Sequence, residues 1–391
     1  MSFAAAQEYM QSDGIDAWLC YDFRGSNAAF AQLLPGKRST TRRAALLIPA
    51  VGEALLCHHG LDGPSFADVS LPRATYLGWR DWRTWLEGAL SGKARVAMEY
   101  SPGCALPVVS MVDAGTVELV RSLGVEVVSS ANLVQACVAR WSPRALEQHI
   151  LASKRVAEIK DRAFAMIRDR LGAGKTVFEH TVAAQIRADF QAAGLEWPDG
   201  PIVAVNAHSG DPHYEPAAEH PTPIQRGDWV MIDLWARVPG DENVHADITW
   251  MGFVGRQVPP RNRAVYEVVK AARDAALERA RAGWRRKERV EGWQLDEAAR
   301  QVIIDAGFGE AIKHRTGHSL SPGPRVHGIG MNLDNLETHD TREMLPGIGF
   351  TIEPGVYLPE FGVRLEIDVY VDPSEGPRVT SCIQDEIVLV D

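Results

Sequence analysis

The segment Trp229–Val254 reads WVMIDLWARVPGDENVHADITWMGFV and determines how the second half of the chain is interpreted. It contains two apolar, strand-like runs, Trp229–Val238 and His245–Val254, on either side of Pro239–Asn243. Pro, Gly, Asp and Asn are typical turn residues, so the middle segment predicts two neighbouring strands joined as a hairpin. Further strand-like and helical runs follow, which predicts an α+β domain with a mostly antiparallel sheet.

Four carboxylates of this half lie in apolar, strand-like surroundings. Asp233 and Asp247 lie one in each run of the hairpin, Glu353 ends a later run, and Glu366 lies within another. A buried carboxylate without a partner costs several kcal/mol or becomes protonated. We therefore expect the four to share a cation. Carboxylates with one or two imidazoles suit Mn, Zn, Co or Fe, and two such ions about 3.5–4 Å apart would hold a hydroxide between them.

Each carboxylate also has an ordinary structural explanation. Asp233 alone fits a strand-edge acid paired with an arginine, Asp247 fits a strand end, and Glu353 fits a turn before Pro-Gly. Glu366 has Arg364 as a neighbour two residues away. Their joint occurrence in this order favours the shared cation.

The stretch His314–Gly330, HRTGHSLSPGPRVHGIG, places three histidines among glycines and prolines. Gly and Pro interrupt both long helices and central strands, so this backbone is predicted to be irregular. His318 by itself fits a hydrogen-bonded loop histidine as well as a metal ligand.

Residues 1–140 have a different pattern, in which short apolar runs alternate with helix-like runs. This alternation predicts an α/β layered domain. The strand-like runs are Ala17–Tyr21, Ala44–Ile48, Ala54–His58, Val96–Tyr100 and Val125–Val128, and the helix-like runs are Trp82–Leu90 and Val109–Leu123.

We place the domain boundary near residue 140, which gives domains 1–140 and 141–391. Ser142 and Pro143 fit the cap and first position of a long helix ending near Leu171. Thr176–Glu179 is predicted to be a capping box for the next helix. Later predictions are helices over about 260–282 and 294–306 and strands over 349–353, 363–371 and 382–390.

Bulk properties exclude several classes of partner. The net charge of −10 argues against nucleic acid, because phosphate binding needs a basic face. The N-terminus lacks the pattern of a signal peptide, and no apolar run is long enough to span a membrane. Five scattered cysteines favour reduced thiols over a disulfide framework. We expect a soluble, cytoplasmic protein.

The ordered carboxylates and the Thr-Gly-His motif together resemble the pita-bread metallopeptidases, in the branch of prolidase and aminopeptidase P. The resemblance covers the C-terminal domain, and the N-terminal domain looks like the creatinase/prolidase-like domain of that branch. It implies two divalent metal ions per subunit, a homodimer, and the metal ligands Asp233, Asp247, His318, Glu353 and Glu366. His327, in His-Gly-Ile-Gly, is the alternative imidazole ligand; we favour His318 because Thr-Gly precedes it.

The resemblance also implies roles around the metals. His213, His314, His327 and Arg364 match substrate-binding positions, and Glu353 and His327 match catalytic ones. His318 and His327 are nine residues apart, where many relatives have seven, and His245 lies where relatives often have a tyrosine. The Pro-Gly-Pro segment lengthens this spacing and bends the loop, which affects where His327 lies. The histidine at position 245 affects which metal the site prefers.

The function implied is that of an Xaa-Pro dipeptidase, which cleaves the bond before a C-terminal proline. The alternatives are an aminopeptidase P acting on longer peptides, a creatinase-like hydrolase without metal, and a non-catalytic binding protein of the same fold. A dipeptidase must hold the substrate's carboxylate, for which Arg364, His314 and Arg342 are candidates.

Overall fold

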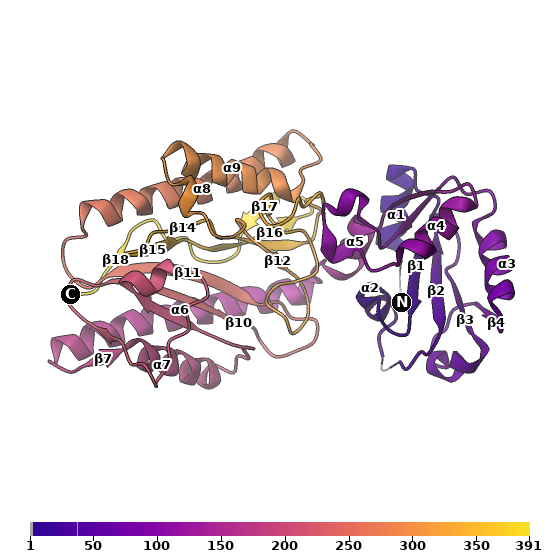
Figure 1. Cartoon of the computed structure of the whole chain (residues 1–391). Helices are drawn as coiled ribbons and strands as arrows, with labels where there is room; N and C mark the ends of the chain where they lie inside the picture. Colours follow the sequence, from indigo (N-terminus) through magenta and orange to yellow (C-terminus); the bar gives the residue numbers. More distant parts are fainter. Residues whose placement is uncertain (1–2, 37) are drawn as a thin grey trace. The chain divides into compact units, whose positions relative to one another are not determined.

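The computed structural model describes residues 3–36 and 38–391 (Figure 1). The chain divides into two compact units, Met1–Val138 and Ala139–Asp391, each with its own hydrophobic core. None of the helices in these described ranges has the length and apolar composition that crossing a bilayer requires.

The N-terminal unit is built on a six-stranded mixed sheet. Its strands are β1 (Ala17–Phe23), β2 (Arg43–Pro49), β3 (Leu55–His59), β4 (Arg73–Tyr76), β5 (Arg95–Met98) and β6 (Glu126–Ser129), in the order β4-β3-β2-β1-β5-β6. Its helices are α1 (Ala4–Asp13), α2 (Ala28–Leu33), α3 (Trp79–Leu90), α4 (Ala114–Ser122) and α5 (Ala131–Val138). Strands β1, β2 and β3 pair antiparallel, whereas the pairs β3–β4, β1–β5 and β5–β6 are parallel.

The α/β prediction for this unit is confirmed, with two local differences. The helix predicted over Val109–Leu123 begins only at Ala114, because Asp113 caps it by accepting a hydrogen bond from the Thr116 amide at 2.9 Å. Strand β4 was not predicted, because its sequence RATY has no apolar run that marks a strand.

The C-terminal unit contains two four-stranded sheets and two short ladders. The first sheet has the order β18-β11-β10-β8 and the second the order β12-β13-β16-β17; β14 pairs with β15 and β7 with β9. The strands are β7 (Val177–Phe178), β8 (Ile202–Val205), β9 (Pro223–Ile224), β10 (Trp229–Ala236), β11 (Ala246–Phe253), β12 (Ser319–Leu320), β13 (Gly349–Ile352), β14 (Gly355–Tyr357), β15 (Gly362–Arg364), β16 (Ile367–Asp372), β17 (Gly376–Val379) and β18 (Val388–Leu389). Only the β11–β18 pair is parallel in the two larger sheets.

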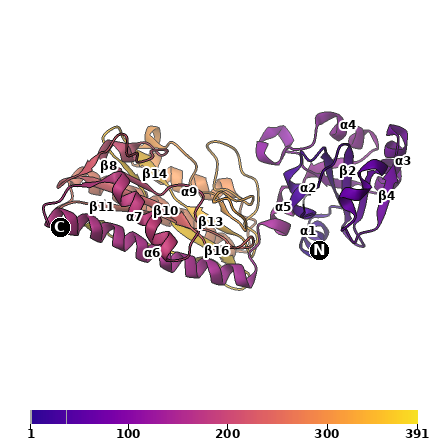
Figure 2. The same cartoon turned by 90° about the horizontal axis from the view of Figure 1, so that it is seen from below.

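Two helix pairs enclose these sheets. The helices are α6 (Pro143–Gly172), α7 (Glu179–Ala192), α8 (Pro260–Arg285) and α9 (Gly292–Asp305). Figures 1 and 2 show α6 and α7 along one side of the strands and α8 and α9 along the other. This arrangement is the α+β architecture that the sequence predicts.

The contact between α6 and β11 shows how the layers approach each other. The Phe164 ring of α6 lies over Gly252, where an added Cβ would be 2.5 Å from the ring atom Cε1. A side chain at this position would therefore push the helix away from the sheet. Phe164 belongs to the apolar layer that packs against the hairpin, and helix α6 contacts strand β11 at this position.

The two predicted helix starts have different outcomes. Ser142 caps α6 by accepting a hydrogen bond from the Ala145 amide at 3.1 Å, as predicted. The predicted capping box at Thr176–Glu179 is wrong. Thr181 instead accepts the Phe178 amide at 3.1 Å, and the Glu179 side chain is buried, where it accepts the Val205 amide at 2.6 Å.

Two predicted strands are shorter than the sequence pattern indicates. The run over 363–371 breaks at Leu365 and Glu366, because β15 pairs with β14 whereas β16 pairs with β13. The run over 382–390 keeps only β18. Gln384 replaces strand pairing there: its side-chain amide accepts the Met251 amide at 2.8 Å and donates to the Met251 carbonyl at 2.7 Å.

Candidate metal centre

The register of β10 and β11 places both hairpin aspartates on one face of the sheet. Asp233 lies opposite Thr249, and Trp235 lies opposite Asp247. Opposed residues share a face, and so do residues two apart in a strand. The four side chains therefore face the same side, and Asp233 and Asp247 are diagonal neighbours.

The two glutamates reach this face from the second sheet. Ile352 of β13 pairs with Ile367 of β16, and Glu353 and Glu366 are the next residues beyond that pair. The Thr249 hydroxyl donates to Glu366 Oε2 at 2.8 Å, which links the glutamate to the hairpin. The ends of the second sheet thus supply two carboxylates to the aspartates of the first.

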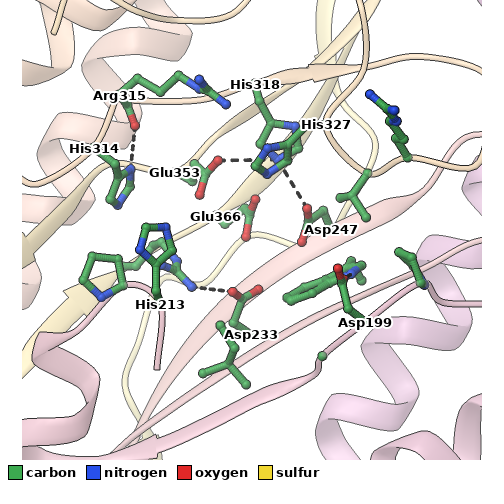
Figure 3. Close-up of a pocket in the computed structure, with 18 of the residues that line it drawn as sticks. Asp199, His213, Asp233, Asp247, His314, Arg315, His318, His327, Glu353 and Glu366 are labelled. Atoms are coloured by element: carbon green, nitrogen blue, oxygen red, sulfur yellow. Dashed lines mark hydrogen bonds and ion pairs between the residues drawn. The ribbon is translucent and has the colours of Figure 1, made fainter. Parts of the chain in front are cut away.

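His318 is held so that one ring nitrogen faces these carboxylates. Its Nδ1 lies 3.2 Å from the Ser319 carbonyl oxygen, to which an Nδ1–H donates. Its Nε2 lies 3.4 Å from Asp247 Oδ2 and 3.5 Å from Glu353 Oε1. Dashed lines in Figure 3 mark these two contacts. Burial lowers the pKa of His318, so the neutral ring directs a lone pair toward the carboxylate oxygens.

The electrostatics of the cluster call for a cation. Burial, followed by repulsion from Asp233, raises the pKa of Asp247 well above its usual range. Burial and the Asp247 charge raise the pKa of Glu366 well above its usual range in the same way. Burial raises the pKa of Glu353, but the neighbouring His318, His314 and Arg364 outweigh burial and lower this pKa. A bound cation would let all these groups remain ionised.

The donor set fits a divalent metal. Asp247, His318 and Glu366 each offer one ligand atom, and these atoms lie within 4.8 Å of one another. One oxygen of Asp233 contacts the Arg364 guanidinium, whereas its buried Oδ1 has no hydrogen-bond partner among the described residues. Carboxylate oxygens with an imidazole nitrogen are the ligands that Mn, Zn, Co and Fe accept.

The cluster lies in a cavity of about 810 Å³, which the predicted substrate histidines also line. The His327 ring lies 4.1 Å from the His318 ring, centroid to centroid, and does not belong to the group of ligand atoms around Asp247. His213 is exposed to the cavity from the opposite wall (Figure 3). This geometry favours His318 over His327 as the imidazole ligand.

His314 and Arg364 line the cavity, but their polar atoms already have partners. His314 Nδ1–H donates to the Arg315 carbonyl at 2.6 Å, and Nε2 accepts the Tyr357 hydroxyl at 2.6 Å. Arg364 donates to Asp233, to Tyr357 at 3.1 Å and to Thr249 at 3.0 Å. Both side chains position neighbouring groups in this structure.

Arg342 is not at the cavity, so its candidacy for the substrate carboxylate is wrong. It is 2% exposed and forms a bidentate ion pair with Asp340, with a further hydrogen bond to the Ile329 carbonyl at 2.5 Å. His245 is also buried away from the cavity lining. Burial lowers the pKa of His245 to about 3, and its Nδ1 has no partner within the described residues.

Sequence reasoning missed three residues that shape the site. Thr249 lies two residues after Asp247, so strand periodicity was a signal for its position on the same face. Tyr357 lies in the short strand β14, which the sequence pattern did not mark. Asp199 lies at the cavity and accepts the Trp235 indole N–H at 2.9 Å; no local motif indicates it.

Comparison with known proteins identifies relatives of this chain. The chain is 31% identical over 236 residues to the Xaa-Pro dipeptidase of Pyrococcus horikoshii, which is 60% of this chain and 61% of that protein. It is 29% identical over 371 residues to a Mycobacterium bovis protein named "Probable dipeptidase PepE", with 91% of this chain and 88% of the relative covered. For another curated relative the matched share is 54% of its length.

The fold is shared with solved structures as well. Dipeptidase PepE from Mycobacterium ulcerans superimposes with a TM-score of 0.65 at 24% identity, covering 99% of this chain and 96% of that one. The predicted pita-bread fold, preceded by an α/β domain, is thereby confirmed. The sequence profile of metallopeptidase family M24 matches residues 152–373, more than half of the chain and all five candidate ligands. The chain therefore belongs to metallopeptidase family M24.

Proposed function

We propose that this protein is an Xaa-Pro dipeptidase that holds two divalent metal ions with Asp233, Asp247, His318, Glu353 and Glu366. The convergence of these five side chains from two sheets on one cavity is the observation that supports the proposal most directly. The family membership supports metal-dependent peptide hydrolysis, and the P. horikoshii relative supports the choice of Xaa-Pro dipeptides.

When bound, the cations would supply Lewis acidity and lower the pKa of a bound water. Glu353 is the least buried of the four carboxylates and faces the cavity, so it is placed to accept that water's proton. Its lowered pKa keeps it ionised and ready for this role. Glu353 then delivers the proton to the proline nitrogen as the C–N bond breaks.

His327 is the candidate for stabilising the oxyanion. Its ring lies against His318 at the cavity wall, and the neighbouring His318, followed by burial, lowers the pKa of His327 to about 4. The neutral ring therefore donates through one N–H to the developing charge on the scissile carbonyl oxygen. The proline nitrogen of the substrate has no N–H, so a cavity that offers it no acceptor favours proline.

Metal dependence is the first test of the proposal. Protein stripped of metal should lose hydrolysis of an Xaa-Pro dipeptide, and Mn, Zn, Co or Fe should restore it to different extents. Full activity in the stripped protein would contradict the proposal and favour the creatinase-like alternative. Metal binding without hydrolysis of any proline peptide would favour a non-catalytic protein.

Peptide length separates the dipeptidase from the aminopeptidase P alternative. An Xaa-Pro dipeptide and an Xaa-Pro-Yaa tripeptide should be compared under identical conditions. The dipeptidase proposal expects faster turnover of the dipeptide, and faster turnover of the tripeptide would overturn it. The homodimer and the cytoplasmic location remain predictions, the first of which light scattering would check.

A further inference from the structure

Four cationic side chains line the cavity, and three of them are already engaged. Lys313 Nζ donates to the Gly210 carbonyl at 2.6 Å, and Arg315 pairs with Glu337 at 3.2 Å. Arg364 is buried against Asp233, Thr249 and Tyr357. Among the described cations that line this cavity, only Arg325 has no hydrogen-bond or ion-pair partner.

The backbone around Arg325 is anchored on both sides. Before it, the Gly323 carbonyl accepts a hydrogen bond from the buried Arg237, and the Gly323 amide donates to the Asn243 carbonyl at 3.3 Å. After it, the Gly328 amide donates to the Ser319 carbonyl at 2.7 Å. The loop therefore holds the exposed Arg325 at the cavity by contacts that do not involve its own side chain.

The charges of the cavity explain why an unpaired arginine is useful there. Besides the carboxylates of the candidate metal centre, Asp199, Glu215 and Glu337 line the same space. A substrate carboxylate entering this acidic surrounding needs a compensating cation. A guanidinium is always charged and offers two parallel N–H donors that match the two oxygens of a carboxylate.

We propose that Arg325 binds the C-terminal carboxylate of the substrate and thereby selects dipeptides over longer or amidated peptides. This inference rests on the proposed Xaa-Pro dipeptidase function and names the side chain that limits substrate length. His314, Arg342 and Arg364 are occupied elsewhere, which leaves Arg325 as the cation available for this contact. An amidated dipeptide lacks the charge that Arg325 pairs with, and a longer peptide has its carboxylate at least one residue further from the scissile bond.

The test compares alanyl-proline with alanyl-prolinamide, which differ only in the terminal charge. In metal-loaded wild-type protein the free acid should have the higher kcat/KM. Arg325→Gln should reduce the acid-to-amide ratio of kcat/KM by about 10- to 100-fold, mainly through KM, because a charge-assisted pair is lost. Arg325→Lys, which keeps the charge without the planar fork, should give an intermediate ratio.

Arg315→Gln is the matched control. It removes one positive charge from the same cavity, but that charge already pairs with Glu337. Both substrates should therefore change by the same factor, and the acid-to-amide ratio should stay at the wild-type value. A ratio that falls equally in both variants would show a general effect of cavity charge and would overturn the assignment to Arg325.

Calorimetric binding of the same two probes separates this inference from the proposed function. If the wild type cleaves neither probe but binds the acid more tightly, and Arg325→Gln removes that preference, the inference stands while the dipeptidase proposal fails. If Arg325→Gln keeps the wild-type preference in both turnover and binding, the inference is wrong even where the enzyme is a dipeptidase.

Discussion

The two carboxylate oxygens of Asp233 have different surroundings. One contacts the Arg364 guanidinium, and the other is buried without a hydrogen-bond partner within the described residues. Burial raises the pKa of Asp233, and the arginine opposes this effect. Arg364 thus helps to keep the carboxylate charged while leaving one oxygen available to a metal ion.

Asp247→Asn is expected to abolish metal binding while stabilising the metal-free protein at neutral pH. The raised pKa of Asp247 means that its ionised form opposes folding once the pH exceeds the unfolded pKa, and the amide removes that charge. Hydrolysis should fall at least about 100-fold, because a metal ligand is lost. Elemental analysis and thermal unfolding with and without metal would measure both effects.

The contrast between the two proteins is the control for this prediction. Adding metal at about 100 times its Kd should stabilise the wild type by about 2.7 kcal/mol and leave Asp247→Asn unchanged. Equal metal content in the two proteins would remove Asp247 from the ligand set.

Arg342→Ala should destabilise the protein without changing substrate choice. Removing one partner of a buried ion pair costs about 3–5 kcal/mol, because the buried Asp340 would lose its counter-charge. Denaturant unfolding measures the loss, and the acid-to-amide ratio of kcat/KM should match the wild type. A changed acid-to-amide ratio with an unchanged free energy of unfolding would indicate that Arg342 contacts the substrate.

The residues that the sequence indicated share one property. Asp233, Asp247 and Glu366 are charged side chains in apolar runs, and His318 is marked by Thr-Gly, so each signal is local. Their assignment as metal ligands remains a prediction. Arg342 and Arg325 could not be told apart by local sequence, because only tertiary contacts pair one of them with Asp340 and leave the other unpaired.

Among the elements, α6 includes a buried histidine that should make stability depend on pH. His149 Nδ1–H donates to the His245 carbonyl at 2.9 Å, and Nε2 accepts the Thr380 hydroxyl at 2.8 Å. Burial lowers the pKa of His149 to about 4 from an ordinary value of 6.5. Between these values the unfolded chain binds a proton that the folded chain does not, so stability falls as pH decreases.

His149→Gln is expected to flatten this dependence. Between about pH 7.5 and about pH 4.5, the wild type should lose roughly 2 to 3 kcal/mol more unfolding free energy than the variant. His220→Gln, at an exposed position, is the control and should keep the wild-type slope. Equal slopes in the wild type and His149→Gln would contradict the neutral, buried state of His149.

Elements were predictable where one pattern covered a whole segment. The hairpin of β10 and β11 and the long helix α6 follow from apolar runs and a Ser-Pro start. The break between β15 and β16 was not predictable, because the apolar run continues while the strand changes its pairing partner. The role of Gln384 was not predictable either, because nothing in the local sequence shows that its side-chain amide pairs with the backbone of β11 in place of a strand.

At the scale of the whole molecule, all candidate metal ligands belong to the unit Ala139–Asp391. Adding Mn²⁺ to metal-free protein should therefore slow amide hydrogen exchange in β10, β11 and β13, and not in β1, β2 and β3. Some amides exchange only through openings that release the metal. With free Mn²⁺ at about 100 times its Kd, the hydrogen-exchange protection factors of these amides should rise about 100-fold. Equal protection in both units, or protection in Asp247→Asn, would contradict this localisation.

The fold classes of the two units, α/β and α+β, were readable from the patterns of strand-like and helix-like runs. The order of the strands was not, because β12, β13, β16 and β17 form a sheet from segments whose spacing along the chain does not fix their neighbours. The resemblance to a known family predicted the pita-bread fold without giving the order of these strands.

The candidate metal ligands span positions 233 to 366 and come from both sheets of one unit. During translation, a nascent chain that has received only the hairpin has two of the five candidate ligands, and it gains the fifth when residue 366 is added. Tight metal binding should consequently begin only after residue 366 has been synthesised. Shorter ribosome-bound fragments should lose the ion to a chelator.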